Sequence, residues 1–167
     1  LTEPQYVIAP TSAVSAATCA GAPSTVGCRV LEFVYAPSTT ATASNPGNYA
    51  GQVQQINLWA TAPGASAATA TPIAAYDYTS NGQLADVWDP RLSTPLKTAY
   101  TYDSAGRVAT LTPPGQLPWT FSYDKVGRNG DAGDGMLLTA SRPTLQAGTT
   151  GTTNGGTATT SVVYDVP

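Results

Sequence analysis

The chain has 167 residues, of which only 10% are charged, and its formal net charge is −3. This charge pattern excludes the basic face that a nucleic-acid partner requires. The sequence also lacks the run of roughly 18 apolar residues that a membrane helix needs, and it has neither a basic segment followed by an apolar one nor an initiating Met.

Short β-prone segments, in which apolar or aromatic residues often recur at every second position, follow one another along the chain. Links rich in Gly, Pro, Ser and Thr separate them, including the long stretch RPTLQAGTTGTTNGG. The Ala-rich stretches SAVSAAT and GASAATATP are interrupted by Thr, Gly and Pro, which disfavours helix. We therefore predict an all-β fold of about ten short antiparallel strands, with little or no helix. The segments are QYVIA, RVLEFVY, GQVQQINLW, TPIAAYDY, KTAYTYD, GRVATLT, PWTFSYD and MLLTA.

The only cysteines, Cys19 and Cys28, enclose the loop AGAPSTVG. Two strands joined by such a loop would bring the side chains to disulfide distance, and the alternative is two buried free thiols in a cytosolic protein. We favour the disulfide, which would place the protein outside the cytoplasm. With two cysteines and no histidine the chain cannot close a zinc shell, so no metal or cofactor is predicted.

The segment YTYDSAGRVATL contains a hairpin motif. Alternation places Tyr100 and Tyr102 on one face of a strand. Asp103 then begins a type I turn, because its side chain can accept backbone N–H groups, and Gly106 takes a positive φ as a bulge. Arg107 is expected to point outward as the chain returns.

Variants of this motif recur along the chain. YDYTSNGQLADV lies 24 positions earlier. Its turn, Thr79–Gly82, is equivalent, although Asn81 and Gly82 allow a type I′ turn instead. Leu84 and Val87 are three positions apart, which predicts either a bulge or the end of the strand. Repetition with a unit slightly over twenty residues is typical of stacked hairpins, each unable to bury its face alone.

This pattern resembles the YD repeats of the Rhs (rearrangement hotspot) family, which are shared with insecticidal toxin-complex C components and teneurins. The clear resemblance covers about residues 73–142. The residues that carry it are Tyr102, Asp103, Gly106 and Arg107; Tyr123, Asp124, Gly127 and Arg128; the variant Tyr78 and Gly82; and Tyr164 and Asp165.

Members of that family wind a long β-sheet into a hollow shell around a toxic C-terminal segment, or act at cell surfaces. The resemblance therefore implies a scaffold without turnover, built as a hairpin meander within a β-shell or curved sheet. The chain is too short to close such a shell, and it lacks the Asp/Gly-rich core segment at which family members cleave themselves. We expect a fragment of a larger secreted or cell-surface protein.

Catalytic and metal sites are weakly indicated. Asp86 and Asp89 flank Trp88, which is the arrangement nearest to a glycosidase pair. However, Asp89 before Pro90 is typical of a turn, and the chain has no histidine to act as a base, so we predict no enzyme. The loop Asn129–Gly135 has the oxygen-rich, glycine-hinged composition of a calcium loop, but it lacks a closing Glu, and a solvated hairpin loop is the preferred interpretation.

Three tryptophans, Trp59, Trp88 and Trp119, offer flat faces on which sugars could stack. In a chain poor in Leu and Phe, burial of these rings is the preferred alternative. A scaffold should bury its Tyr and Trp rings on one common face and should have no aromatic-lined groove. A carbohydrate- or receptor-binding β module with exposed aromatics would have such a groove.

The predicted organisation is one continuous structural unit in three parts. Residues 1–72 hold the N-terminal strands, a Cys19/Cys28 hairpin and a degenerate repeat. Residues 73–142 hold the YD hairpins, and residues 143–167 hold a Thr/Gly-rich loop and the start of a further repeat. The expected partners are the remainder of a parent chain or other copies of this chain, because cut-out repeats leave unpaired strand edges. The binding alternative adds cell-surface glycans or a receptor.

Overall fold

The computed structural model describes residues 3–124, 135–145 and 154–164. These residues form ten strands and one short helix, and the chain divides into two compact units, residues 1–97 and 98–167. The prediction of an all-β antiparallel meander with very little helix is confirmed. Among the described residues, no helix is long and apolar enough to cross a membrane.

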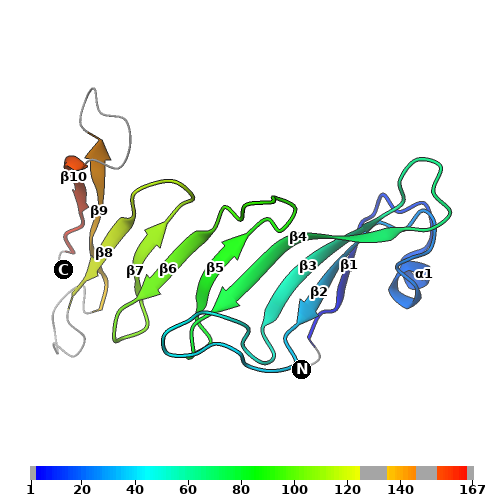
Figure 1. Cartoon of the computed structure of the whole chain (residues 1–167), viewed down its shortest axis with the longest axis horizontal. Coiled ribbons are helices and arrows are strands. Elements are labelled where there is room, and N and C mark those ends of the chain that lie inside the picture. The colour runs from blue at the N-terminus through cyan, green and yellow to red at the C-terminus, as the bar shows by residue number, and fades with distance from the viewer. Residues whose placement is uncertain (1–2, 125–134, 146–153, 165–167) are drawn as a thin grey trace. The chain divides into compact units, whose positions relative to one another are not determined.

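Unit 1 is a meander in which each strand pairs antiparallel with the next one along the chain, as Figure 1 shows. The alternating segments seen in the sequence form these strands, because period-two side chains put one set of residues on each face. The elements are β1 (Tyr6–Ile8), α1 (Ala16–Gly21), β2 (Val30–Tyr35), β3 (Val53–Ala60), β4 (Thr69–Tyr78) and β5 (Leu84–Trp88).

Unit 2 continues the same pattern, with every strand antiparallel to its predecessor. Residues predicted to form a Thr/Gly-rich loop contribute instead to two long strands, β9 and β10. Thr has a high β-propensity, and Pro143 in β9 is tolerated opposite Thr157 of β10. The strands are β6 (Thr98–Tyr102), β7 (Val108–Thr112), β8 (Trp119–Tyr123), β9 (Leu137–Leu145) and β10 (Asn154–Ser161).

The disulfide between Cys19 and Cys28 is present, with its Cα atoms 5.5 Å apart. The predicted hairpin around it is wrong, because Cys19 lies in helix α1, which begins after the capping residue Ser15. The Ser15 hydroxyl accepts the Thr18 N–H, and this cap favours a helical turn where Ala-rich composition alone did not. Cys19, Cys28 and Val30 form the main core cluster of unit 1. The half-buried Trp59 packs against this cluster.

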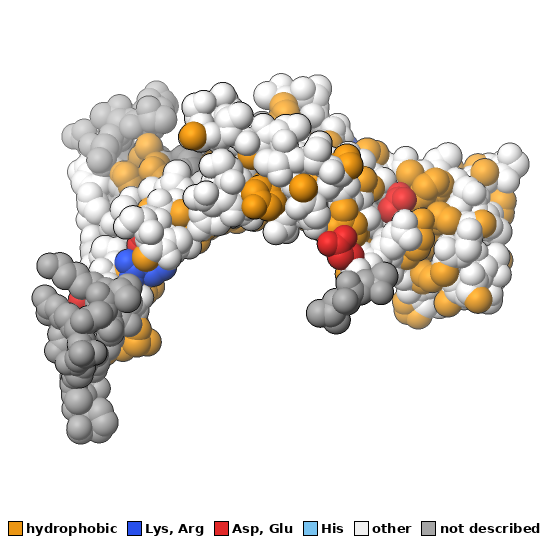
Figure 2. Space-filling model, turned by 90° about the horizontal axis from the view of Figure 1, so that it is seen from below, with side chains coloured by type: hydrophobic (Ala, Val, Ile, Leu, Met, Phe, Trp, Pro, Cys, Tyr) orange, Lys and Arg blue, Asp and Glu red, His pale blue; other side chains and the backbone are white. Residues whose placement is uncertain are grey.

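Most other large side chains in both units are only half buried, because a single-layer sheet covers neither of its faces completely. The buried hydrophobic residues are few and mostly small. Figure 2 shows that charged side chains are sparse on the face in view, where hydrophobic side chains lie among neutral polar ones. The hairpins therefore need stabilising contacts besides a hydrophobic core.

Candidate functional site

The YD turn at Asp103 forms as the sequence predicts. The Asp103 N–H donates to the Arg107 carbonyl at 2.9 Å, and the Gly106 N–H donates to the Asp103 carbonyl at 3.0 Å. Asp103 Oδ1 also accepts the backbone N–H groups of Ala105 and Arg107, each at 2.9 Å. Gly106 has φ 80°, where a side chain would be strained. The carboxylate of the repeat is therefore a turn former.

The variant turn at Thr79 uses the same geometry with a hydroxyl in place of the carboxylate. Thr79 N–H donates to the Gln83 carbonyl at 2.8 Å, and Thr79 Oγ1 accepts the N–H groups of Asn81 and Gln83. Gly82 has φ 78°, whereas no described residue other than glycine has a positive φ. A type I′ turn needs positive φ at both central residues, so that alternative is wrong.

Arg107 does not point outward as predicted. Its guanidinium pairs with Asp103 at 2.8 Å and lies 4.6 Å from the centroid of the Tyr123 ring. Its Nη1 also donates to the backbone carbonyls of Asp124 and Gly135, at 3.1 and 3.2 Å. Arg107 thus joins its own turn to the end of the next hairpin, a contact between residues too distant in sequence for local pattern reasoning to find.

A second type of link joins successive hairpins through tyrosine hydroxyls. In each case the tyrosine near the end of an incoming strand donates to a backbone carbonyl at or just before the start of an earlier strand. We call these hydrogen bonds the tyrosine links. They are Tyr35 to Pro4 at 2.7 Å, Tyr78 to Val53 at 2.6 Å, Tyr123 to Val108 at 2.8 Å and Tyr164 to Leu137 at 3.0 Å.

The tyrosines of the repeat also share a register. Four of them lie opposite the first residue of the returning strand and next to a β-bulge. The bulge beside Tyr78 falls between Leu84 and Asp86, within the Leu84–Val87 stretch where a bulge was predicted. The pairs are Tyr35 with Val53, Tyr78 with Leu84, Tyr102 with Val108, and Tyr123 with Leu137. Sequence reasoning missed the tyrosine links. The available signal was that this position holds Tyr every time, whereas Phe33 and Phe121 occupy positions two residues earlier.

Burial affects the acidity of two of these tyrosines, Tyr78 and Tyr102. Tyr78 is 8% exposed. Its pKa is raised above the usual value, first by burial and then by the nearby Tyr76. Burial also raises the pKa of Tyr102, with a smaller contribution from Tyr100. The higher pKa keeps the hydroxyls of Tyr78 and Tyr102 protonated to a more alkaline pH.

The candidate glycosidase residues of unit 1 have structural partners. Asp86 lies opposite Asp77, and Lys97 Nζ bridges the two carboxylates at 3.2 and 3.0 Å while lying 4.3 Å from the Trp88 ring centroid. Burial opposes the charge on Lys97, but hydrogen bonds to Asp77 and Asp86 outweigh it, so the lysine pKa is raised. Lys97 thus offsets part of the negative charge of the two carboxylates and gives both a structural partner.

Asp89 belongs to a turn, as predicted from the proline that follows it. Its carboxylate accepts the Arg91 N–H and pairs with the Arg91 guanidinium at 2.6 Å. These hydrogen bonds lower the pKa of Asp89 to about 2. A group with so low a pKa is a poor general acid, so Asp89 does not suit the acid role of a glycosidase pair.

A pH dependence follows from the turn carboxylates. The pKa of Asp103 is also lowered, chiefly by the Arg107 N–H. A carboxyl group whose pKa is lower in the folded than in the unfolded state stabilises the fold at any pH above its unfolded-state pKa. This stabilisation is lost as the pH falls through the folded-state pKa. We expect the urea midpoint to fall between pH 4 and pH 2, the window set by the Asp89 pKa of about 2. The Asp89→Asn and Asp103→Asn variants should each show a smaller fall, and equal falls in all three proteins would contradict this assignment.

The tryptophans are half buried and contact other side chains. The Trp59 indole N–H donates to Glu32 at 2.8 Å, and Arg142 lies 5.2 Å from the Trp119 ring centroid. In β4 and β5, alternation puts Trp88 on the face of Asp77 and Asp86, opposite to Tyr78. The expectation that all Tyr and Trp rings share one face is therefore wrong for unit 1. Trp88 lies on the other face, where its ring contacts Lys97.

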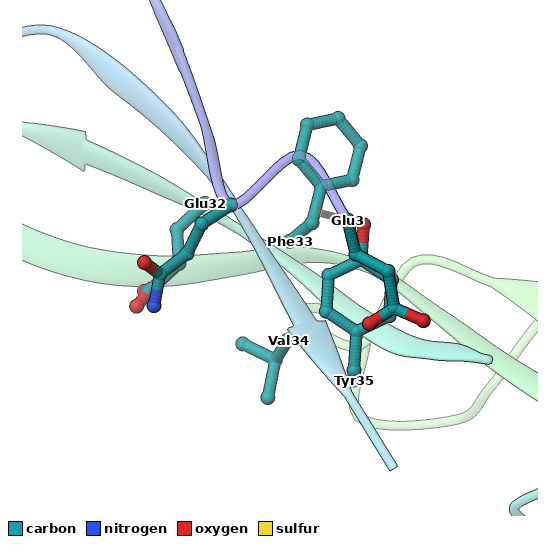
Figure 3. A pocket seen from close by; sticks show the side chains of 6 residues that line it. Glu3, Glu32, Phe33, Val34 and Tyr35 are labelled. Carbon is teal, nitrogen blue, oxygen red and sulfur yellow. The ribbon is translucent and has the colours of Figure 1, made fainter. Parts of the chain in front are cut away.

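Among the hollows on the described residues, one in each unit bears on the predicted sites. In unit 1, Glu32 and Val34 project to one side of β2 and Phe33 to the other, next to Glu3 (Figure 3). Glu32 is already bonded to Asn57 and Trp59, and no described group of His, Cys, Asp and Glu could hold a metal. In unit 2 an apolar groove is lined by Tyr100, Val108, Leu111, Phe121, Tyr123 and Leu137, contrary to the expectation for a pure scaffold.

Some predicted site residues are outside the described residues. These are most of the candidate calcium loop Asn129–Gly135, together with Gly127, Arg128 and Asp165. Their predicted roles stay predictions.

Comparison with known families gave one match. Residues 78–117, which are 40 of the 167 residues, match the family model described as RHS Repeat. Comparisons with curated proteins and with solved structures gave no match. The matched stretch contains β5, β6 and β7 and both turns described above. Residues 78–117 of this chain are therefore an RHS repeat segment.

Proposed function

We propose that this chain is a non-catalytic structural segment of a secreted Rhs-type protein, serving as shell wall or surface scaffold for a larger toxin or adhesin. The observation that carries the proposal is the use made of the repeat's polar groups. The Asp103 carboxylate is bonded to its own turn, and the hydroxyls of Tyr78, Tyr123 and Tyr164 are bonded to earlier strands. These groups hold neighbouring hairpins together, which is what a structural segment of a shell or scaffold requires.

Two further observations support this role. The Asp residues that suggested hydrolysis are ion-paired, and RHS repeats are generally structural rather than catalytic. The Cys19–Cys28 disulfide is typical of extracellular proteins, in agreement with secretion.

The apolar groove of unit 2 favours a second candidate function, recognition of a glycan or a receptor. Its three aromatic rings, Tyr100, Phe121 and Tyr123, are half buried and reachable. Trp119 pairs with Leu111, which lines the groove. The fluorescence of Trp119 would therefore report an occupant of the groove. A panel of oligosaccharides that leaves the fluorescence unchanged would count against glycan recognition, and a saturable change that Phe121→Ala removes would favour it.

The wall proposal is tested by extending the chain. In repeat arrays, stability is roughly the sum of each repeat and its interfaces with neighbours. We expect a longer protein, carrying the residues that the gene encodes beyond either end, to melt at a higher temperature than the 167-residue chain. Thermal unfolding of both proteins would be followed by circular dichroism at the tyrosine bands. An unrelated linker of equal length is the control. Equal melting temperatures for the native and linker extensions, or a gene encoding no further repeats, would contradict the proposal.

A further inference from the structure

The apolar groove of unit 2 continues into an aromatic row that ends at a positive charge. Phe121 and Tyr123 line the groove, and alternation along β8 places Trp119 on the same face. Trp119 lies opposite Leu111, another lining residue. The guanidinium of Arg142 lies 5.2 Å from the centroid of the Trp119 ring. The grooved face therefore carries Arg142 beside its aromatic rings.

Two arginines of unit 2 lie against aromatic rings, but the fold uses them differently. Arg107 pairs with Asp103 and donates to two backbone carbonyls of the next hairpin. Arg142 forms no ion pair with any Asp or Glu among residues 3–124, 135–145 and 154–164. A guanidinium that lies over an aromatic ring keeps its in-plane N–H groups available to bind a carboxylate at two points. Arg142 thus offers a positive charge to a ligand.

The rings of this face suit a ligand with flat apolar surfaces. Trp119, Phe121 and Tyr123 occupy every second position of β8, so they recur about 6.6–6.8 Å apart along the strand. The groove has a volume of about 340 Å³, near the lower end of the range for small-ligand sites. A row of rings beside a groove of this size fits a chain of sugar units, because each pyranose ring has an apolar face of C–H groups.

An extended peptide fits this place less well. Peptides that bind to sheets usually add a strand at an open edge, where backbone hydrogen bonds supply the affinity. The strands that line the groove have neighbours on both sides: β7 lies between β6 and β8, and β8 lies between β7 and β9. No further strand can join the sheet there, whereas a sugar needs only the exposed ring faces.

We propose that the groove binds an acidic polysaccharide, in which uronic acid rings stack on Phe121 and its neighbours while a carboxylate pairs with Arg142. The positive charge of Arg142 decides between an acidic and a neutral sugar. The inference rests on the glycan recognition described above as the second candidate function, and it names the ligand class of that groove. It involves binding only, with no chemical step.

The test is isothermal titration calorimetry of the chain with matched pairs of oligosaccharides. The acidic probes are short oligomers of galacturonic acid and of mannuronic acid, and each is paired with the same oligomer after reduction of its carboxyl groups to alcohols. We expect at least one acidic oligomer to bind about tenfold more tightly than its neutral counterpart, because hydrogen bonds between charged groups are the stronger class. Added salt should reduce this difference, since it screens exposed charges.

Substitutions then separate the charge from the rings. Arg142→Gln should lower the affinity for the acidic oligomer to that of its neutral counterpart, and Arg142→Lys should retain part of the preference. Arg91→Gln in unit 1 removes the same charge from an arginine that is paired with Asp89, so it should bind as the native chain does. Phe121→Ala should weaken the binding of acidic and neutral oligomers alike. Unchanged affinity of Arg142→Gln for the neutral oligomer shows that its groove is intact.

The outcomes distinguish this inference from the functions proposed above. Equal affinities for acidic and neutral oligomers, or an acid preference that survives Arg142→Gln, would overturn the acidic ligand and leave glycan recognition standing. If no oligomer binds, glycan recognition fails together with this inference, and the wall proposal is unaffected. Binding of a glutamate-rich peptide in the absence of any sugar binding would assign the groove to a peptide and refute the proposal.

Discussion

Replacing both Cys19 and Cys28 with alanine is expected to lower the free energy of unfolding by about 2–5 kcal/mol, the usual cost of losing a native disulfide from a small domain. The bond spans nine residues of sequence and limits the unfolded chain. Both cysteines are buried, at 0% and 2% exposure, beside Val30. Their loss therefore also leaves space in the main core cluster of unit 1. Urea denaturation gives the free energy directly.

Reduction provides the control for this experiment. Reducing agent should destabilise the native chain by a similar amount and leave the double variant unchanged. Because the sulfurs are inaccessible in the folded state, reduction of the native chain should be slow without denaturant. A native chain that is shown by mass to be fully reduced, yet melts at the same temperature, would contradict a stabilising role.

Tyr78→Ala is the second substitution expected to have a large effect, about 3–5 kcal/mol, which is typical of truncating a buried aromatic residue. Tyr78 is 8% exposed, and its hydroxyl donates to the Val53 carbonyl at 2.6 Å. Tyr78→Phe keeps the ring and removes the tyrosine link alone. It should cost about 1 kcal/mol, the net value of one hydrogen bond. Both values come from urea denaturation.

Tyr76→Phe is the matched control, since Tyr76 lies on the same face of β4 but is not part of the tyrosine links. We expect that variant to unfold at the native urea concentration. If Tyr78→Phe and Tyr76→Phe were both neutral, the hydroxyl would be dispensable, and the hairpins would be joined by ring packing and backbone pairing only.

The local structure of the hairpins could be predicted because short-range chemistry determines it. Asp103 accepts N–H groups within four residues of itself, and Gly106 takes a backbone conformation that other residues avoid. Period-two alternation likewise identified most strands. Helix α1 was missed because its stability depends on the Ser15 cap, which composition does not reveal, and because the predicted disulfide was assigned to a hairpin.

The sequence alone determined that this protein is a series of hairpins with a repeated tyrosine, and it favoured the Cys19–Cys28 disulfide that the structure contains. Only the tertiary structure decided what the tyrosine and arginine of the repeat do. Tyr123 reaches back 15 residues to Val108, and Arg107 reaches forward 28 residues to Gly135. Such contacts depend on strand register, and each bulge resets that register. A motif shows which residues recur, but the neighbouring strand determines which groups they meet.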